Sequence, residues 1–459
     1  MVLDLVHPSL FPVVWGLTRA LEQGTVPLED CAKYIGKGKT VDSYEANSAE
    51  PQWGSYQWLP AEVSYREGVA KITSYINNLH PTQHKSLYGV LERITAATIP
   101  LWEESFKGDP THRRIVVTGT GQDDWTYPAG LMYQVPNVPG PRGLIDPTTR
   151  EPEGGFLEDE DDEWQYEDHF EDWNRQHRIL VYPEPREYIK QAELAAQVDK
   201  EAVKLESSEH GLQVIYKLAN IHLTPESPAY SGGTWHVEGT NNESIVASAI
   251  YYYDQDNITE SHLAFRQAID HEELMMIPEQ NQHESLEAYL GIENEGPAVQ
   301  TLGQVLTREG RLLAFPNVLQ HQVQPFELQD ATRPGHRKIL AMFLIDPHRP
   351  ILSSAHVPPQ RRDWWAEEVR NDGGLDILPA EIFDLTVGLV DDFPLSWEQA
   401  VEHRAKLMEE RSVFVDHQTE TMFEVGFACH DRFDFANSVL ICDCRRHSAS
   451  ASIRTCWGC

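Results

Sequence analysis

The sequence predicts an α+β protein whose core is an antiparallel β-sandwich or jelly roll with flanking helices. Between residues 179 and 350, apolar side chains alternate or form short runs separated by turn residues, which is the pattern of β-strands. The connections are rich in turn residues and show no regular alternation of strand and helix, so a doubly wound parallel sheet is not expected. Helical spacing of apolar residues occurs before and after this region, and these helices should flank the core.

The predicted elements can be placed in order along the chain. Residues 71–76 have the pattern of a strand, and a helix should follow between Pro81 and Pro100, where apolar residues recur at three- and four-residue spacing. Core strands are predicted at residues 212–220, 245–253, 311–315 and 338–345. Ser396 and Gln399 form a capping box, which predicts a last helix. Its apolar residues are expected to pack against the core: Trp397, Ala400, Val401, Leu407 and Met408.

Composition and charge exclude several classes of protein. Of the 459 residues, 41% are hydrophobic and 24% are charged, which are the proportions of a folded globular protein and not of a disordered or fibrous one. The net charge of −35 repels nucleic acid, so no nucleic-acid partner is expected. No stretch is apolar enough to span a membrane, and Asp4 stands where a secretory signal needs a basic residue. We therefore expect a cytoplasmic protein.

Composition also divides the chain into regions. A mixed α/β N-terminal region should pack on the β-core, which carries the candidate site, and a helical region should follow the core. Five of the six cysteines lie in the last 31 residues; their spacing permits a zinc site, although a flexible tail is the favoured interpretation. The predicted regions are 1–150 (N-terminal), 151–178 (acidic), 179–350 (core), 351–430 (helical) and 431–459 (cysteine-containing tail).

The acidic segment has two interpretations. Twelve Asp and Glu residues and no Lys or Arg lie between residues 151 and 172. Such a run is typical of a solvated face or a mobile loop. The alternative is a docking strip for a basic protein partner, because opposite charges attract across an interface.

The candidate site begins in the segment Ser231–Gly239, which reads SGGTWHVEG. In extended backbone alternate side chains share a face, so His236 and Glu238 should lie side by side. A third ligand must come from a distant strand, and His321 lies just before one. Two imidazoles and one carboxylate on one side of a six-coordinate ion leave three positions free, as in non-haem Fe(II) oxygenases. We interpret His236, Glu238 and His321 as metal ligands and as the catalytic centre.

An oxygenase of this kind that uses 2-oxoglutarate needs a fixed cation for the far carboxylate of that cosubstrate. Arg337 opens the predicted strand 338–345, and its planar guanidinium suits a bidentate carboxylate clamp. Arg333 is the alternative, but it precedes Pro-Gly and should lie in a turn. Lys217 is a weaker alternative, and Lys338 should face the other side of the sheet by alternation.

The same spacing also fits less specific interpretations. His236 and Glu238 can form an ordinary hydrogen-bonded pair, with His321 capping a loop. His336 can replace His321 as the distal ligand, although it follows the turn Arg333-Pro-Gly. A lone His-x-Glu is a weak signal. The strand context, the glycine-rich lead-in and the basic residue on the last core strand strengthen it.

Five segments of the chain are long enough to be compared with known sequences. They begin at Asp4 (DLVHPSLFP), Lys71 (KITSYINNLHP), Leu212 (LQVIYKLANI), Gly233 (GTWHVEG) and Arg333 (RPGHRKILA). With these segments the chain resembles a fungal family of uncharacterised proteins, the domain of unknown function numbered 4246, from about Leu3 to about His430. The resemblance implies a double-stranded β-helix core, cupin-like and similar to 2-oxoglutarate oxygenases. It also implies that His236, Glu238, His321 and Arg337 occupy the corresponding motif positions.

The chain departs from the usual oxygenase pattern at two of these positions. The carboxylate is Glu238, where Asp is common, and the extra methylene moves the metal. Ile339 stands where an Arg-x-Ser motif would place serine after Arg337. Family members usually have further sequence upstream of the point where this chain begins.

These observations predict an Fe(II)- and 2-oxoglutarate-dependent dioxygenase of the hydroxylase type, with Fe(II) and 2-oxoglutarate as cofactors. Its substrate, a small molecule or a protein side chain, is not specified by the sequence. One alternative is a cupin-like metalloenzyme that does not use 2-oxoglutarate. The other is a non-catalytic β-sandwich that binds a basic protein through the acidic segment.

Overall fold

The structure is a computed structural model of the chain. It describes residues 2–42, 54–106, 132–134, 173, 176–177, 179–181, 204–208, 211–269, 287, 291–293, 296–371, 378–390 and 393–420. The acidic run 151–172 and the cysteine-containing tail 431–459 lie outside these residues, and the division of the chain into five regions remains a prediction.

Two compact units are present. Unit 1 comprises residues 1–116, 185–269 and 299–425, and unit 2 comprises residues 117–184, 270–298 and 426–459. In unit 2, β8 (Met132–Gln134) pairs antiparallel with β9 (Ile179–Val181). Unit 1 contains the candidate site.

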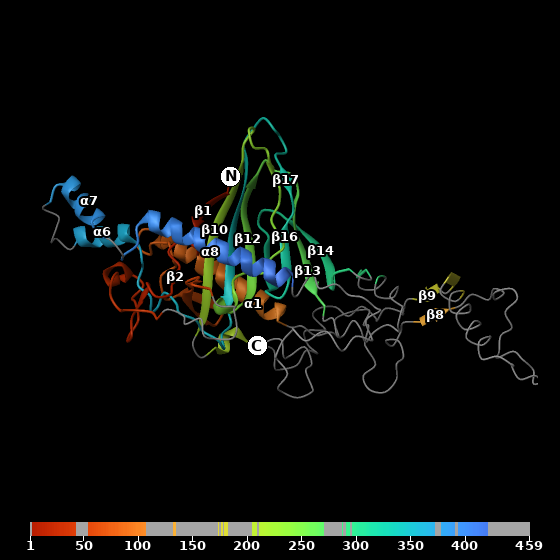
Figure 1. Cartoon of the computed structure of the whole chain (residues 1–459), viewed down its shortest axis with the longest axis horizontal. Coiled ribbons are helices and arrows are strands. Elements are labelled where there is room, and N and C mark those ends of the chain that lie inside the picture. Colours follow the sequence, from red (N-terminus) through yellow and green to blue (C-terminus); the bar gives the residue numbers. More distant parts are fainter. Residues whose placement is uncertain are drawn as a thin grey trace, which may run out of the picture. The chain divides into compact units, whose positions relative to one another are not determined.

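Unit 1 is built on a seven-stranded antiparallel sheet (Figure 1). The strands run in the order β15 (Leu312–Pro316), β12 (Ile245–Asp256), β18 (Gly335–Ile345), β10 (Leu212–Leu223), β6 (Ala61–Arg66) and β7 (Val69–Ile72). The first part of β10 pairs with β6, and β1 (Val2–Val6) pairs with its last part. The four predicted core strands are present, each within a few residues of its expected bounds. The strand predicted at residues 71–76 ends earlier, at Ile72.

Apolar side chains cover both faces of this sheet, so the sheet is buried between two layers. On one face, Val214 of β10 and Met342 of β18 pack against α1 (Lys85–Ser105). The prediction that Pro100 ends this helix is wrong, because α1 continues to Ser105. A proline inside a helix removes one hydrogen bond, but the last turn also buries Trp102 completely against the sheet, and this burial favours its continuation.

The opposite face of the sheet is covered by α8 (Trp397–Gln418) and by a three-stranded antiparallel sheet. That second sheet has the order β14 (Val299–Thr307), β13 (Ser261–Ala268) and β16 (Gln320–Val323). Ile215, Phe343, Leu263 and Leu407 belong to the hydrophobic cluster on this side, which we call the inner face. Figure 1 shows α8 crossing β10 and β12.

The structure confirms the predicted cap of the last helix. Only part of the apolar face predicted for this helix is buried. The Ser396 side chain accepts a hydrogen bond from the Gln399 N–H, and the Gln399 side chain accepts one from the Ser396 N–H, as the capping box requires. Leu407 is buried in the inner-face cluster and Ala400 in a separate cluster with Leu395, whereas three of the predicted core residues are exposed, because α8 packs on the rest of the chain through a narrow face. The exposed residues are Trp397, Val401 and Met408.

Shorter elements complete the described chain. They are β2 (Val13–Val14), β3 (Arg19–Ala20), β4 (Lys39–Thr40), β5 (Tyr56–Gln57), β11 (Ala229–Tyr230), β17 (Phe326–Glu327), α6 (Arg362–Asn371), α7 (Ala380–Gly388) and the 3₁₀ turns Cys31–Tyr34, Leu205–Ser207 and Asn241–Glu243. The prediction of mixed helix and strand with antiparallel sheets is therefore confirmed. No helix among the described residues combines the length and the apolar character needed to cross a bilayer.

Candidate metal centre

A backbone bridge brings the two distant histidines together. The N–H of His236 donates to the carbonyl of His321 at 3.2 Å, and the N–H of His321 donates to the carbonyl of His236 at 3.0 Å. A residue pair that exchanges both bonds carries its side chains on the same side, and the ring centroids are 4.4 Å apart. The segment Ser231–Gly239, expected to be extended, makes this one bridge and no regular strand. His321 itself lies on β16 beside β13.

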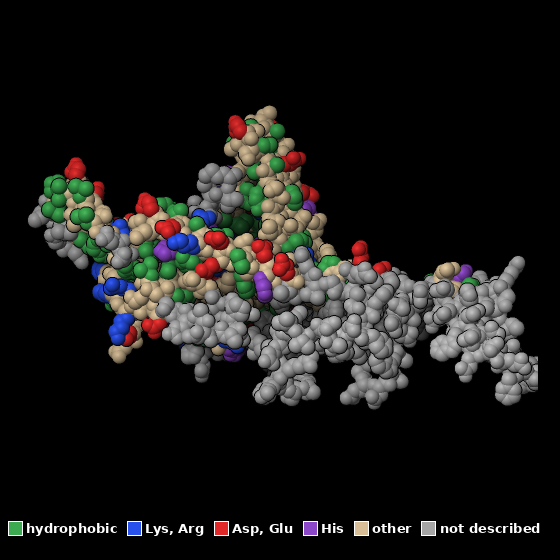
Figure 2. All heavy atoms as spheres, viewed as in Figure 1, with side chains coloured by type: hydrophobic (Ala, Val, Ile, Leu, Met, Phe, Trp, Pro, Cys, Tyr) green, Lys and Arg blue, Asp and Glu red, His purple; other side chains and the backbone are tan. Residues whose placement is uncertain are grey.

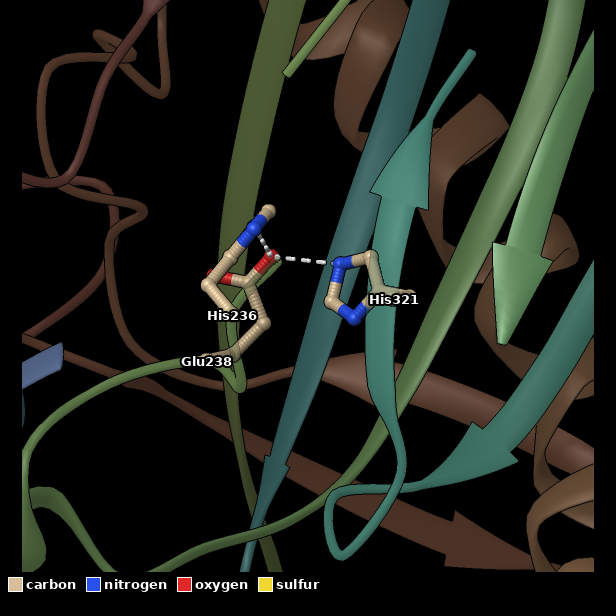
Figure 3. A group of neighbouring side chains, drawn as sticks. All are labelled: His236, Glu238 and His321. Atoms are coloured by element: carbon tan, nitrogen blue, oxygen red, sulfur yellow. Dashed lines mark ion pairs between the residues drawn. The ribbon is translucent and has the colours of Figure 1, made fainter. Parts of the chain in front are cut away.

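The tips of the three predicted ligands converge (Figure 3). An Oε1 atom of Glu238 lies 3.7 Å from Nε2 of His236 and 3.5 Å from Nε2 of His321. All three ligand atoms lie within 4.8 Å of one another. The side chain of His321 is 3% exposed and that of Glu238 13%, whereas that of His236 is 32% exposed. The candidate metal centre is therefore shielded from solvent at His321 and accessible to solvent at His236.

The tautomer of His236 suits a metal ligand. Its Nδ1 lies 2.8 Å from the carbonyl of Thr234, and a carbonyl can only accept a hydrogen bond, so Nδ1 carries the proton. In the neutral ring Nε2, which lies 3.7 Å from Oε1 of Glu238, is then the nitrogen available to bind a metal. Such a bond from the second ring nitrogen fixes the orientation of metal-binding histidines in proteins.

The charges at this centre stabilise an ionised carboxylate. Burial alone would raise the pKa of Glu238, but its contacts with His236 and His321 outweigh burial and hold that pKa well below the usual range. Burial is the largest single influence on His236 and lowers its pKa, but the hydrogen bond and charge of Glu238 and the bond to the Thr234 carbonyl together outweigh it, and the net shift is upward. Burial and the charge of His236 lower the pKa of His321. The carboxylate is thus an acceptor-only group between two imidazoles, which is a suitable donor set for a divalent transition metal.

Asn317 holds the backbone of Glu238 and was not identified from the sequence. Its Oδ1 accepts a hydrogen bond from the N–H of Glu238 at 2.9 Å, and its Nδ2 donates to the carbonyls of Glu238 at 2.8 Å and Ile245 at 3.0 Å. The only sequence signal is an Asn directly after Pro316, which indicates a turn. Nothing in the sequence relates that turn to Glu238.

Replacing Asn317 by alanine should weaken metal binding by about 10- to 100-fold, the range observed for groups that orient metal ligands. The expected cause is loss of the backbone clamp on Glu238. Equilibrium dialysis against Fe(II) under anaerobic conditions measures the affinity. A matched control is Asn220→Ala, which removes a buried amide that accepts from the Tyr253 hydroxyl and should leave metal affinity unchanged. Equal affinity in Asn317→Ala and the unmodified protein would show that the clamp is not needed.

Arg337 is a buried cation without a carboxylate partner in the described part of the chain. Its side chain is almost fully buried, Nη1 donates to the Ser261 hydroxyl at 2.6 Å, and Nε has no hydrogen-bond partner. The guanidinium lies 4.6 Å from the ring centroid of Phe326 and 5.7 Å from that of Tyr252. Burial lowers the pKa of Arg337, with the nearby tyrosines acting in the opposite direction. A buried charge without a partner is unfavourable, so this guanidinium is suited to receive an anion.

The alternative residues lie elsewhere. Arg333 is exposed and pairs with Asp256 at 3.3 Å. Lys338 pairs with Asp254, on the opposite face of the sheet from Arg337, as strand alternation predicts. His336 also contacts Asp254, at 3.0 Å, and is not a member of the converging group.

Comparison with known proteins gives one family and several weak structural similarities. A family model described as a protein of unknown function, DUF4246, matches residues 1–368. This match contains all five segments that carry the resemblance but ends before His430, and α8 lies outside it. No curated protein matches the chain.

Similar solved structures include dioxygenase and cupin proteins. The Fe(II)/α-ketoglutarate-dependent dioxygenase TqaL is 16% identical, with a TM-score of 0.20 and coverage of 34% of this chain and 48% of that chain. A bsmA homologue from Methylobium petroleophilum PM1 is 12% identical, with a TM-score of 0.19, and the match covers 37% of this chain and 57% of that chain. A cupin-2 domain protein from Shewanella frigidimarina is 9% identical, with a TM-score of 0.12, and the match covers 34% of this chain and 91% of that chain. The chain thus spans about half the length of the first two.

Proposed function

This chain belongs to the family of proteins of unknown function DUF4246, and we propose that it is an Fe(II)- and 2-oxoglutarate-dependent dioxygenase of the hydroxylase type. The observation that carries the proposal is the convergence of His236, Glu238 and His321 within 4.8 Å. We further propose that the seven-stranded and three-stranded sheets form a double-stranded β-helix, with this centre between them.

The donor set fits Fe(II). Two imidazoles and one carboxylate on one side of an ion form the facial arrangement of non-haem iron oxygenases, which leaves positions for other ligands. Iron held there would supply the oxidative chemistry that consumes 2-oxoglutarate and O₂. The surrounding residues hold and orient the three ligands. Thr234 fixes the tautomer of His236, and Asn317 fixes the backbone of Glu238. The burial of His321 excludes water from one side of the centre.

The surroundings of Arg337 fit the far carboxylate of 2-oxoglutarate. A carboxylate bound there would pair with the buried guanidinium and accept a bond from its unpartnered Nε. Ser261, which contacts Arg337, lies on β13, and Phe265 of the same strand pairs with His321. One strand therefore connects the proposed anchor with the proposed metal ligands.

The Arg337→Met variant tests the cosubstrate assignment. Loss of a charge-assisted pair should raise the KM for 2-oxoglutarate by about 10- to 100-fold, from the 1.5–3 kcal/mol typical of such bonds, while Fe(II) binding stays intact. Succinate release measures turnover, and Arg333→Met is the matched surface control, with no expected change.

Two results would contradict parts of this proposal. Absence of succinate release from the iron-loaded protein, across a broad panel of candidate substrates, would contradict the use of 2-oxoglutarate. An unchanged KM in Arg337→Met, with iron bound, would favour a cupin-like metalloenzyme that does not anchor the cosubstrate at this position. Binding of a basic protein through residues 151–172 remains a separate prediction.

A further inference from the structure

A second cation, Lys217, lies on the inner face of the large sheet. Lys217 pairs with Ala341 of β18, and Ala341 belongs to the inner-face cluster together with Ile215. The flanking residues Tyr216 and Leu218 belong to the cluster on the opposite face. Because side chains alternate along a strand and cross-strand partners share a face, the Lys217 side chain projects from the inner face, which also carries Arg337.

The inner face carries a buried histidine and also reaches the metal centre. Phe315 belongs to the cluster on this face, and its ring centroid lies 5.0 Å from that of His321. His7 follows β1, in which Val6 pairs with Leu218, and this register places His7 beside Lys217. The strand register therefore places His7 and Lys217 side by side on the inner face. The charges of Lys217 and Glu238 both act on the pKa of His7, in opposite directions, which agrees with this placement.

His7 is a neutral hydrogen-bond donor in this region. Its Nδ1 accepts a bond from the N–H of Ser9 at 3.1 Å, so the ring proton is on Nε2. Burial, and then the positive charges of Lys217, Arg404 and Arg411, lower the pKa of His7 to about 2. His7 thus stays uncharged at neutral pH, and its Nε2 has no hydrogen-bond partner among the residues that the structure describes.

Positive charge without a matching carboxylate is unexpected in this protein. The net charge is −35, and Figure 2 shows acidic side chains spread over the described face of the molecule. Lys217 nevertheless forms no ion pair within the described ranges. The Lys217 residue is partly buried, and an anion that arrives with a ligand would give its ammonium group a partner.

The cosubstrate does not account for this cation. On the paired strands β10 and β18, Lys217 stands opposite Ala341 and Arg337 opposite Ile221. The two positions are four residues apart along the sheet, which at a rise of about 3.3 Å per residue is about 13 Å. Each cation can therefore hold its own anionic group.

We propose that Lys217, with the Nε2 proton of His7, binds a carboxylate of the substrate, so that the substrate is a small organic acid. A single ammonium and one neutral donor match a monoanion. A phosphate more often meets arginine forks or a helix N-terminus. A polyanionic macromolecule would be repelled by the acidic surface. This inference rests on the proposed function, because it places the substrate beside the proposed iron site.

Calorimetric titration of the full chain, loaded with Mn(II) and 2-oxoglutarate, tests this inference with hexanoate and hexanamide as a matched pair. The unmodified protein should bind hexanoate at least about ten-fold more tightly than hexanamide. Lys217→Met should abolish that preference, and Lys217→Arg should retain it. Lys338→Met, on the opposite face, is the matched control and should also retain it. Lys217→Gln serves as a second neutral variant, with circular dichroism to verify folding.

Three outcomes would overturn the inference. They are no preference for hexanoate in the unmodified protein, a preference that survives in both neutral Lys217 variants, and loss of 2-oxoglutarate binding in those variants, which would make Lys217 the cosubstrate anchor. Binding of Mn(II) and of 2-oxoglutarate is measured first on the same samples. If the protein does not bind Mn(II) or does not bind 2-oxoglutarate, but still prefers hexanoate, the proposed function is contradicted. The anion site at Lys217 is then supported without it.

Discussion

Iron affinity is expected to fall by more than about 100-fold when His321 is replaced by alanine, since loss of a group that merely orients a ligand already costs about 10- to 100-fold. The variant removes one of three converging ligand atoms. Its effect should be confined to the site, because the bonds that join residues 236 and 321 are made by backbone atoms and remain possible. Anaerobic equilibrium dialysis, with circular dichroism to verify folding, provides the measurement.

The matched control for this prediction is His336→Ala. His336 was the alternative distal ligand in the sequence, lies on β18 and contacts Asp254. Its loss should leave iron binding unchanged. If the two variants bound iron equally well, His321 would not be a ligand.

Arg411→Ala should destabilise the fold by about 3–5 kcal/mol, the range for breaking a buried ion pair from one side. The guanidinium of Arg411 contacts both carboxylate oxygens of Glu243 at 2.5 Å, and the Glu243 side chain is fully buried. Arg411 also lies 3.6 Å from the ring centroid of Trp58. The variant would leave a buried carboxylate that is bonded only to backbone N–H groups, at Trp58 and Thr240. Urea unfolding followed by tryptophan fluorescence measures the free energy.

A control on the same helix separates this effect from a general change in α8. Lys406 pairs with Glu402 at 2.8 Å, and both side chains are exposed. Lys406→Ala should therefore cost no more than about 0.5 kcal/mol. Combining Arg411→Ala with Glu243→Gln should recover part of the lost stability, because no buried charge then remains. A loss below about 1 kcal/mol in Arg411→Ala would mean that α8 does not fix the loop that follows Glu238.

The sequence predicts the long strands well because their pattern is local. β10, β12 and β18 carry apolar residues on both faces, and each is close to its expected bounds. Alternation also separates Arg337 from Lys338 correctly, because the side-chain period of a strand is two. The convergence of His236, Glu238 and His321 follows from the same reasoning, with the distant partner chosen by residue type and strand context.

The predictions that fail concern interactions between distant parts of the chain. The continuation of α1 past Pro100 depends on burial of Trp102. The exposed side of α8 depends on which of its residues meet the rest of the chain, and these are Ala400 and Leu407. The role of Asn317 needs the turn after β15 to meet the segment of Glu238. The backbone bridge between residues 236 and 321 likewise joins two segments that are far apart in the sequence. None of these contacts leaves a periodic signal in the sequence.

Anomalous diffraction at the iron absorption edge, from crystals grown anaerobically with Fe(II), tests the central claim most directly. We predict a single strong peak at this centre, bonded to Nε2 of His236, Nε2 of His321 and a carboxylate oxygen of Glu238, each at about 2.0–2.2 Å, the range for histidine and carboxylate ligands. A peak elsewhere on the chain, or no peak between these three side chains, would contradict the proposed metal centre.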